Sequence, residues 1–254
     1  SAYMSEPWGV SRIYSIDDPR YRGALFIEPA LLEQIVAAAT EHGLQFTAHS
    51  VGDAAVQTLL DAYEKVDATT PIRPLRHCLT HSNFMSEASV KQAARLGVVM
   101  DIQPVWLWLD SRVLLEQFGD ARLRYFQPLK SIFAAGGVAG GGSDHMQKIG
   151  AARGVNPYDP FLGMATAITR RGRGVVRPVH PEEALTREQA IRFYTINNAS
   201  LMFLEDKVGS LEPGKIADFI VLDRDILRCP EDEIRKTRVL QTFLAGRRVF
   251  PVEP

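Results

Sequence analysis

The chain has 254 residues, of which 46% are hydrophobic and 23% are charged. This composition is typical of a globular protein with a sizeable apolar core. The formal net charge of −1 gives no reason to expect nucleic acid or an anionic membrane surface as a partner. The longest apolar run, around residues 97–109, is interrupted by Asp101 and Gln103, so no segment is expected to cross a bilayer.

The cysteine content and the opening residues favour a reducing compartment. Cys78 and Cys229 are too few for a disulfide framework, and Cys78 falls in a predicted strand, where a buried thiol is expected. The first residues, SAYMSEPWGVS, have neither the basic start nor the apolar core of a secretory signal. A cytoplasmic location is therefore expected, and these residues are interpreted as a loop from within a domain.

Helix and strand patterns alternate up to residue 144. Apolar spacing and end signals predict helices at 28–42, 54–65, 86–96 and 128–135. Asp53 is expected to cap the second of these helices. Short apolar-biased runs predict strands at 44–48, 76–80, 97–104 and 138–143. Such an alternation predicts an α/β fold built from parallel βαβ units.

The rest of the chain changes character at Glu205. Before it, we predict short helical pieces at 110–126, a helix at 160–169, a basic loop at 170–181 and a long amphipathic helix at 188–203. After it, the pattern predicts a strand at 217–223 and a hairpin at 238–250 that turns at Ala245-Gly246. These strands are interpreted as a small separate layer.

Three predicted strands are followed by side chains of the metal-binding type: His49, His81 and Asp144. Because the carboxyl ends of parallel strands meet at one edge of a sheet, these side chains are expected to converge. Imidazole and carboxylate are the ligands of open hydrolytic metal sites. The pattern therefore predicts a metal centre at this edge.

Strand alternation refines the expected geometry. It places His77, Leu79 and His81 on one face of their strand, as it does Gln45, Thr47 and His49. Gly140 and Gly142 would leave room for an ion, water and substrate beside Asp144.

Each candidate also has a structural interpretation. A lone histidine at a strand end is often only hydrogen-bonded. His77 is expected in the core or as a partner of a ligand, and His145 at the mouth of the site. Trp106 is interpreted either as core or as a wall of the substrate site. The basic run Arg170–Arg177 is interpreted as a solvated loop, with binding of an acidic group as the alternative.

The combined motifs resemble the metal-dependent amidohydrolase superfamily, in particular its amidohydrolase 3 type. The matching stretches are FTAHSVGDAAVQTLLDAYE (46–64), RHCLTHSNF (76–84), GGGSDHM (140–146) and residues 185–225. The resemblance implies that residues 1–204 are the C-terminal half of a (β/α)₈ TIM-like barrel, and that residues 205–254 contribute to a small β-sandwich. It implies a divalent metal, expected to be zinc, with His49, His81 and Asp144 as ligands. Asp144 would also move the proton.

The chain departs from the family pattern in three respects. His145-Met146 follows Asp144, where the family often has Ala and then Pro, so the type of substrate stays open. The chain also has no His-x-His pair, and no lysine precedes Lys65. It is therefore predicted to be a fragment of a hydrolase that cleaves amide or other C–N bonds of a small-molecule substrate with a metal-activated hydroxide. Alone it is expected to be inactive, and to pair with a missing N-terminal half or to form a homo-oligomer. The alternatives are a non-catalytic binding or regulatory relative and one half of a split enzyme.

Overall fold

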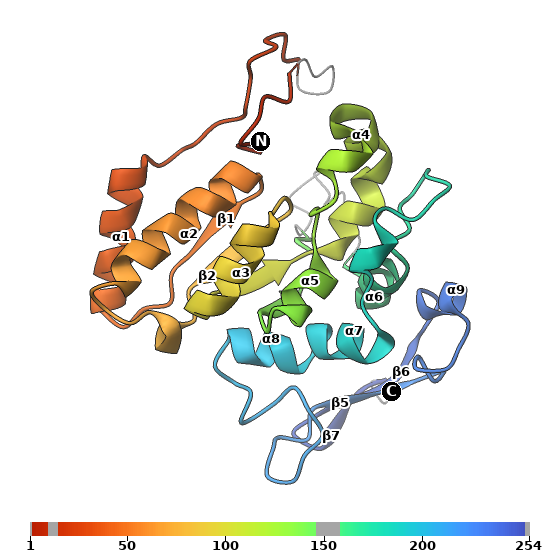
Figure 1. Cartoon of the computed structure of the whole chain (residues 1–254). Coiled ribbons are helices and arrows are strands. Elements are labelled where there is room, and N and C mark those ends of the chain that lie inside the picture. Colours follow the sequence, from red (N-terminus) through yellow and green to blue (C-terminus); the bar gives the residue numbers. More distant parts are fainter. Residues whose placement is uncertain (1, 10–14, 146–157, 252–254) are drawn as a thin grey trace, which may run out of the picture.

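A four-stranded parallel sheet forms the centre of the protein (Figure 1). The computed structural model describes residues 2–9, 15–145 and 158–251. The strands lie in the order of the chain, which is β1 (Thr47–Ser50), β2 (Cys78–His81), β3 (Val99–Ile102) and β4 (Val138–Gly141). Each adjacent pair is parallel, so the carboxyl ends of all four strands meet at one edge. The predicted α/β fold with a parallel sheet is confirmed.

Helices cover one face of this sheet and bury the main core. These are α1 (Pro29–Glu41), α2 (Asp53–Asp67), α3 (Glu87–Leu96) and α5 (Leu129–Ala134), as Figure 1 shows. Alternate strand residues such as Leu79, Met100 and Ala139 point into this core and are fully buried. Burial of such side chains contributes about 1.5–3 kcal/mol each for the larger ones. The opposite face of the sheet carries the polar residues Thr47, His49, Thr80 and Asp101 together with Cys78, Val99 and Val138.

The start of α2 differs from expectation in one detail. Gly52, not Asp53, is the residue that precedes α2, and Asp53 is its first residue. The Asp53 carboxylate accepts backbone N–H groups from Ala54 (2.9 Å) and Ser5 (2.7 Å), so it also ties the N-terminal segment to the helix. A capping box formed by Thr186 and Gln189 is present at the start of α7 (Arg187–Tyr194).

The remaining helices follow β3 or β4 in the chain, apart from η1, which precedes β2. Residues 104–122 form one long helix, α4 (Pro104–Arg122), which has a kink at Gly119, where short pieces were predicted. The helix predicted at 188–203 is wrong as a single element: α7 ends and α8 (Ile196–Leu201) begins at Thr195, whose backbone is not helical. The other short elements are α6 (Pro160–Thr169), α9 (Glu231–Ile234), η1 (Arg73–Leu75) and η2 (Pro181–Glu183).

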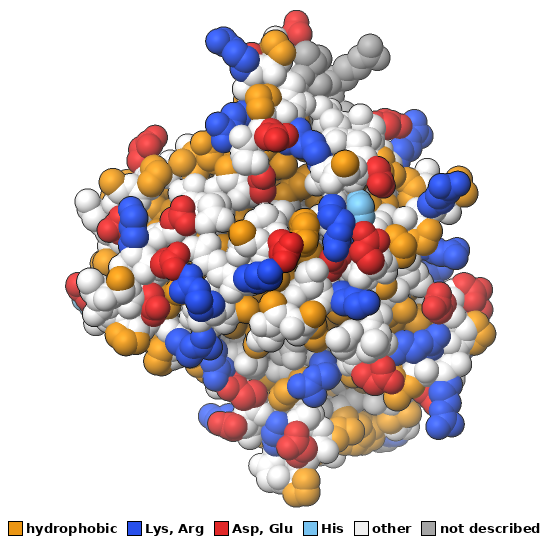
Figure 2. Space-filling model, in the orientation of Figure 1, with side chains coloured by type: hydrophobic (Ala, Val, Ile, Leu, Met, Phe, Trp, Pro, Cys, Tyr) orange, Lys and Arg blue, Asp and Glu red, His pale blue; other side chains and the backbone are white. Residues whose placement is uncertain are grey.

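A second sheet lies apart from the first and is antiparallel. Its order is β5 (Phe219–Leu222), β6 (Val239–Leu244) and β7 (Arg247–Phe250), and the predicted turn at Ala245-Gly246 joins the last two. Figure 2 shows hydrophobic side chains gathered over this part of the surface. Exposed apolar residues on the three strands include Ile220, Leu240, Leu244 and Phe250.

The surface of the helix-covered side carries charges of both signs in an interspersed arrangement (Figure 2). This agrees with the formal net charge of −1. Within the part of the chain that the structure describes, no helix combines the length and the apolar character needed to span a membrane.

Arg170 is the largest fully buried side chain among the described residues. Its guanidinium group donates to the backbone carbonyl groups of Phe126 (2.8 Å), Gln127 (3.0 Å) and Val179 (3.0 Å). Burial lowers the pKa of Arg170 to about 10, which still leaves the group charged at neutral pH. Arg170 therefore fixes the segment between α4 and α5 to the end of α6.

We predict that Arg170→Met lowers the free energy of unfolding by about 3 kcal/mol or more, because buried carbonyl groups lose their donors. The matched variant Arg171→Met, which changes the exposed neighbour, should stay within about 0.5 kcal/mol of the wild type. Urea unfolding of both variants measures the difference. Equal stabilities of the two variants would contradict the assigned role of Arg170.

Candidate metal centre

His81 is the residue whose backbone shapes the candidate site. It ends β2 in the left-handed region, with φ of 77°, and Ser82 follows with φ of 46°. Regular alternation would place His81 beside Leu79 on the helix-covered face. The left-handed turn instead brings the His81 ring to His49 on β1, with the Nε2 and Nδ1 atoms 2.6 Å apart. The prediction that His77, Leu79 and His81 share one face is therefore wrong for His81.

His49 lies on the open face of the sheet. It is the third residue of β1 rather than the first residue after the strand, and it is exposed. Thr47 shares this face, because its hydroxyl lies 2.7 Å from the hydroxyl of Thr80 on β2. The centroids of the His49 and His81 rings are 4.6 Å apart. The structure thus brings together two of the three predicted metal ligands.

Gln103 and Asp101 complete the surroundings of His81, and neither is among the predicted site residues. The Gln103 amide nitrogen Nε2 donates to the backbone oxygen of Asp101 (3.1 Å) and to its carboxylate oxygen Oδ1 (3.0 Å). The amide oxygen Oε1 therefore faces His81, 2.7 Å from Nδ1. The sequence feature that could have indicated them is that Asp101 and Gln103 alternate with the apolar residues Met100 and Ile102.

Burial raises the pKa of the Asp101 carboxyl group, and the nearby Asp144 carboxylate acts in the same direction. His81, the amide of Gln103 and His49 act in the opposite direction. Asp101 is therefore electrostatically linked to all three predicted ligands, although it was not itself predicted to take part.

Asp144 lies at the same edge but makes a different contact. It follows β4 by three residues, is exposed, and accepts a hydrogen bond from Trp106 Nε1 at 3.2 Å. Trp106 belongs to the first turn of α4. Within the described ranges, no three His, Cys, Asp or Glu side chains lie close enough together to hold a metal ion. The structure therefore places the predicted ligands as a histidine pair and, separately, an Asp144–Trp106 pair.

The donor chemistry of the histidine pair fits a divalent ion. A metal-binding imidazole commonly donates its second ring N–H to a carbonyl or carboxylate oxygen, which leaves the other nitrogen for the ion. His81 has this arrangement, with Nδ1 against Gln103 Oε1 and Nε2 directed to His49. An ion held by both rings would replace the hydrogen bond between them. Asp144 is the carboxylate at this edge that could join them.

The two glycines near Asp144 differ in what surrounds them. A Cβ atom at Gly140 would lie 2.2 Å from Oδ1 of Asn198 on α8, so the space beside Gly140 is already filled. A Cβ atom at Gly142 would meet Asp101 Oδ1 at 3.4 Å and Gln103 Cγ at 3.7 Å. Gly142 therefore leaves space for a Cβ atom in ordinary contact with Asp101 and Gln103, which is less than the room expected beside Asp144.

His77 lies on the helix-covered side and is fully buried. Its Nδ1 accepts the backbone N–H of Phe46 (3.0 Å), and its Nε2 lies 2.9 Å from the hydroxyl of Thr40, which donates to Val36. Its ring stacks on Tyr63 with centroids 5.1 Å apart. Because Nδ1 must accept, His77 is neutral, and burial lowers its pKa in agreement.

His145 contacts a neighbouring aromatic ring beyond the end of β4. Its ring centroid lies 4.9 Å from that of Tyr158, and its backbone N–H donates to the Ser143 hydroxyl at 3.2 Å. A cavity of about 210 Å³ lies beside these residues and is lined by Ser143, Tyr158, Gly142, Val105 and Tyr194 among others. Met146 from the predicted GGGSDHM motif lies outside the described residues.

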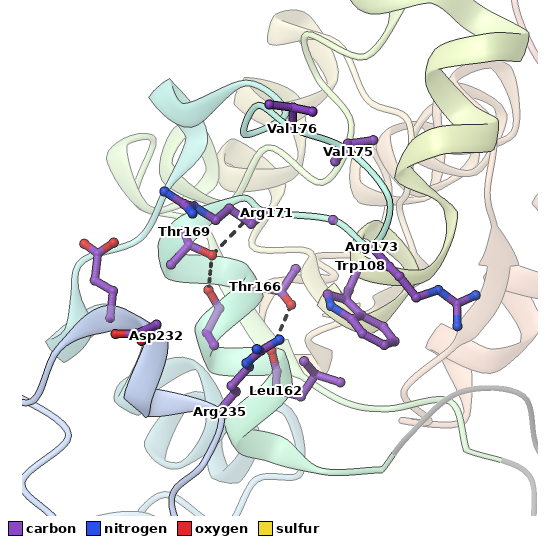
Figure 3. A pocket seen from close by; sticks show the side chains of 13 residues that line it. Trp108, Leu162, Thr166, Thr169, Arg171, Arg173, Val175, Val176, Asp232 and Arg235 are labelled. Carbon is purple, nitrogen blue, oxygen red and sulfur yellow. Dashed lines mark hydrogen bonds between the residues drawn. The ribbon is translucent and has the colours of Figure 1, made fainter.

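A larger cavity of about 520 Å³ lies between α4, α6 and α9 (Figure 3). Arg171 and Arg173 of the basic loop line it, together with Arg235 and Trp108. In Figure 3 the three guanidinium groups lie well apart, and that of Arg173 stands 5.3 Å over the Trp108 ring. They do not converge on one point, so this cavity has no defined site for an acidic group.

Comparison with known proteins assigns the chain to a class. The model of the amidohydrolase family matches residues 2–250, and the chain therefore belongs to that family. Over 91% of its length the chain is 26% identical to an uncharacterized metal-dependent hydrolase from Pyrococcus horikoshii OT3, and the TM-score of the two structures is 0.72. This similarity covers 43% of the Pyrococcus protein.

Curated relatives have varied names. N-substituted formamide deformylase of Arthrobacter pascens is 30% identical over 88% of the chain, and protein LONG AFTER FAR-RED 3 of Arabidopsis thaliana is 28% identical over 93%. The chain spans 40% of the length of the first and 39% of the second. It is thus similar to less than half of each relative.

We predict that His77 makes stability depend on pH. The unfolded chain binds a proton at this residue with a pKa of about 6.5, whereas the folded pKa is lower, so stability is lost as pH falls below about 6.5. The loss can reach about 1.4 kcal/mol per pH unit. His77→Gln should flatten the decline of the unfolding free energy between pH 7 and pH 5. His42→Gln, which changes an exposed imidazole, should leave it unchanged.

Proposed function

We propose that the chain is the C-terminal part of a hydrolase that uses a divalent metal ion to cleave amide or other C–N bonds of small molecules. The observation that carries this proposal is the His49–His81 pair, whose facing ring nitrogens lie 2.6 Å apart at the carboxyl edge of a parallel sheet. The family membership and the name of the deformylase relative support it.

The metal would be held by His49 and His81, with the Asp144 carboxylate as a further ligand. Zinc suits two imidazoles and one carboxylate. When bound, such an ion lowers the pKa of a coordinated water molecule to about 7 and polarises a carbonyl group. The remaining ligands of the family pattern would come from outside these residues.

The Asp144 carboxylate would act on protons. It would accept a proton from the attacking water and pass it to the leaving nitrogen. The N–H group of Trp106, which donates to Asp144 Oδ2, would orient the carboxylate. The indole ring of Trp106 would form a wall beside the substrate. The cavity of about 210 Å³ that Gly142 and Ser143 line would leave room for part of the substrate near this carboxylate.

The exposed edges indicate how this part would be completed. β1 and β4 are the two edge strands of the parallel sheet, and an apolar cavity of about 550 Å³ lies beside His49 at the β1 edge. We propose that residues 1–204 are the C-terminal half of a (β/α)₈ barrel whose other half covers these edges. Residues 205–254 would form one sheet of a small β-sandwich, and its other sheet would cover the apolar β5–β7 face.

Several features of the complete protein stay predictions. These are the inactivity of the chain alone, a homo-oligomeric assembly or pairing with a missing half, a cytoplasmic location and the identity of the metal as zinc. In a split enzyme a second polypeptide would supply the other half. Co-purification of that polypeptide would distinguish a split enzyme from one longer chain.

The second candidate is a non-catalytic binding or regulatory protein with the same fold. The observation that favours it is the separation of Asp144 from the histidine pair: Asp144 bonds to Trp106, and no three-residue metal group forms among the described residues. Metal analysis of the complete protein separates the two candidates, because a protein without bound metal and without hydrolysis of any amide would fit only the second.

We predict that Asp144→Asn in the complete protein lowers kcat for amide hydrolysis by about 10²–10⁴-fold, because the amide cannot accept the proton. The measurement is steady-state hydrolysis of a panel of N-substituted formamides and cyclic amides at saturating zinc. Asp120→Asn, at a side chain that is 79% exposed, is the matched control and should keep wild-type activity. Unchanged hydrolysis by Asp144→Asn would contradict the mechanism.

A further inference from the structure

Gln103 occupies the junction between β3 and α4, directly behind the His81 ring. It is the residue that precedes α4, and only 3% of its surface is exposed. Its side-chain amide bonds to His81 on one side and to Asp101 on the other. Its backbone oxygen accepts from Gln127 Nε2 (2.9 Å) and from the backbone N–H of Trp106 (3.1 Å).

The direction of the Gln103 amide is fixed by its partners. The backbone oxygen of Asp101 can only accept hydrogen bonds, so the Gln103 atom that faces it must be the nitrogen. The oxygen of the same amide then faces His81 Nδ1 and can only accept. His81 must therefore carry its hydrogen on Nδ1 whenever its ring is neutral, and the lone pair lies on Nε2, the atom that faces His49.

The backbone of Gln103 is held from the core. Gln127 donates to its carbonyl group, and the backbone oxygen of Gln127 in turn accepts from the guanidinium group of Arg170. Gln103, Gln127 and Arg170 are all buried. Gln103 Oε1, which determines that His81 carries its hydrogen on Nδ1, thus belongs to a packed and hydrogen-bonded group of side chains. His49, on the other side of His81, is exposed.

We propose that Gln103 is a positioning residue for His81, which holds the imidazole with its Nε2 lone pair presented to a divalent ion. The part of this proposal that concerns the ion rests on the proposed metal-binding function. The part that concerns which nitrogen of His81 carries the hydrogen does not. Removal of such a partner behind a metal-binding histidine typically weakens metal binding by about 10–100-fold.

A purely structural role makes a different prediction. If Gln103 served only to satisfy buried groups, its replacement would lower stability without changing which nitrogen of His81 carries the hydrogen. Gln127→Leu is the matched control, because it also removes a buried glutamine of the same frame but touches Gln103 rather than His81.

The first test is made on the metal-free full chain by two-bond ¹H–¹⁵N correlation spectroscopy of its imidazole rings. In the wild type, His81 should carry its hydrogen on Nδ1. In Gln103→Leu this preference should be lost, and in Gln127→Leu it should be kept. A wild-type His81 with its hydrogen on Nε2 would overturn the proposal, and that result does not depend on whether either variant folds.

The second test is Zn²⁺ affinity, measured by competition with a chromophoric chelator. Gln103→Leu should bind Zn²⁺ about 10–100-fold more weakly than the wild type, and Gln127→Leu within a few-fold of it. Equal affinities for wild type and Gln103→Leu would overturn the role toward the ion. Failure to hydrolyse any amide would instead count against the proposed function, because neither the ring form nor the affinity is measured through activity.

Discussion

The left-handed backbone at His81 is the constraint on which the candidate site depends. For residues other than glycine this conformation costs about 1–3 kcal/mol and persists where the surroundings enforce it. Here two successive residues, His81 and Ser82, adopt it. Without this turn, the His81 ring would join Leu79 in the core, and His49 would have no partner on the open face. The turn thus converts a regular strand end into a corner where two imidazoles meet.

The groups that contact the His81 ring from its inner side are buried and polar. Arg170 holds the backbone of Gln127, Gln127 holds the backbone of Gln103, and the Gln103 amide holds the His81 ring. Buried hydrogen-bonded groups of this kind are rigid because an unpaired member would be costly. His49, which contacts the His81 ring from the other side, is exposed. The site therefore has a rigid inner side, and its outer side, where Asp144 and Trp106 lie, is open to whatever completes the centre.

Most of the helices and strands could be predicted from local patterns. The contacts that pair His49 with His81 and Asp144 with Trp106 could be predicted only in part. Apolar periodicity and glycine signals located the strands and most helices because both are properties of neighbouring residues. The break at Thr195 and the turn at His81 depend instead on packing across the fold, and no local signal marks them. Gln103 was overlooked because its role arises only when β2 and β3 pair side by side. The proximity of His49 and His81 could be predicted because the carboxyl ends of parallel strands meet at one edge.

The central claim is that His49 and His81 together form a corner of a metal centre. The direct measurement is a Zn²⁺ titration of the chain followed through the ¹⁵N shifts of its six histidine rings. The account predicts that His49 and His81 respond together, with loss of the hydrogen bond between them, while buried His77 does not change. A response confined to other histidines, or no response of this pair at saturating Zn²⁺, would contradict the account.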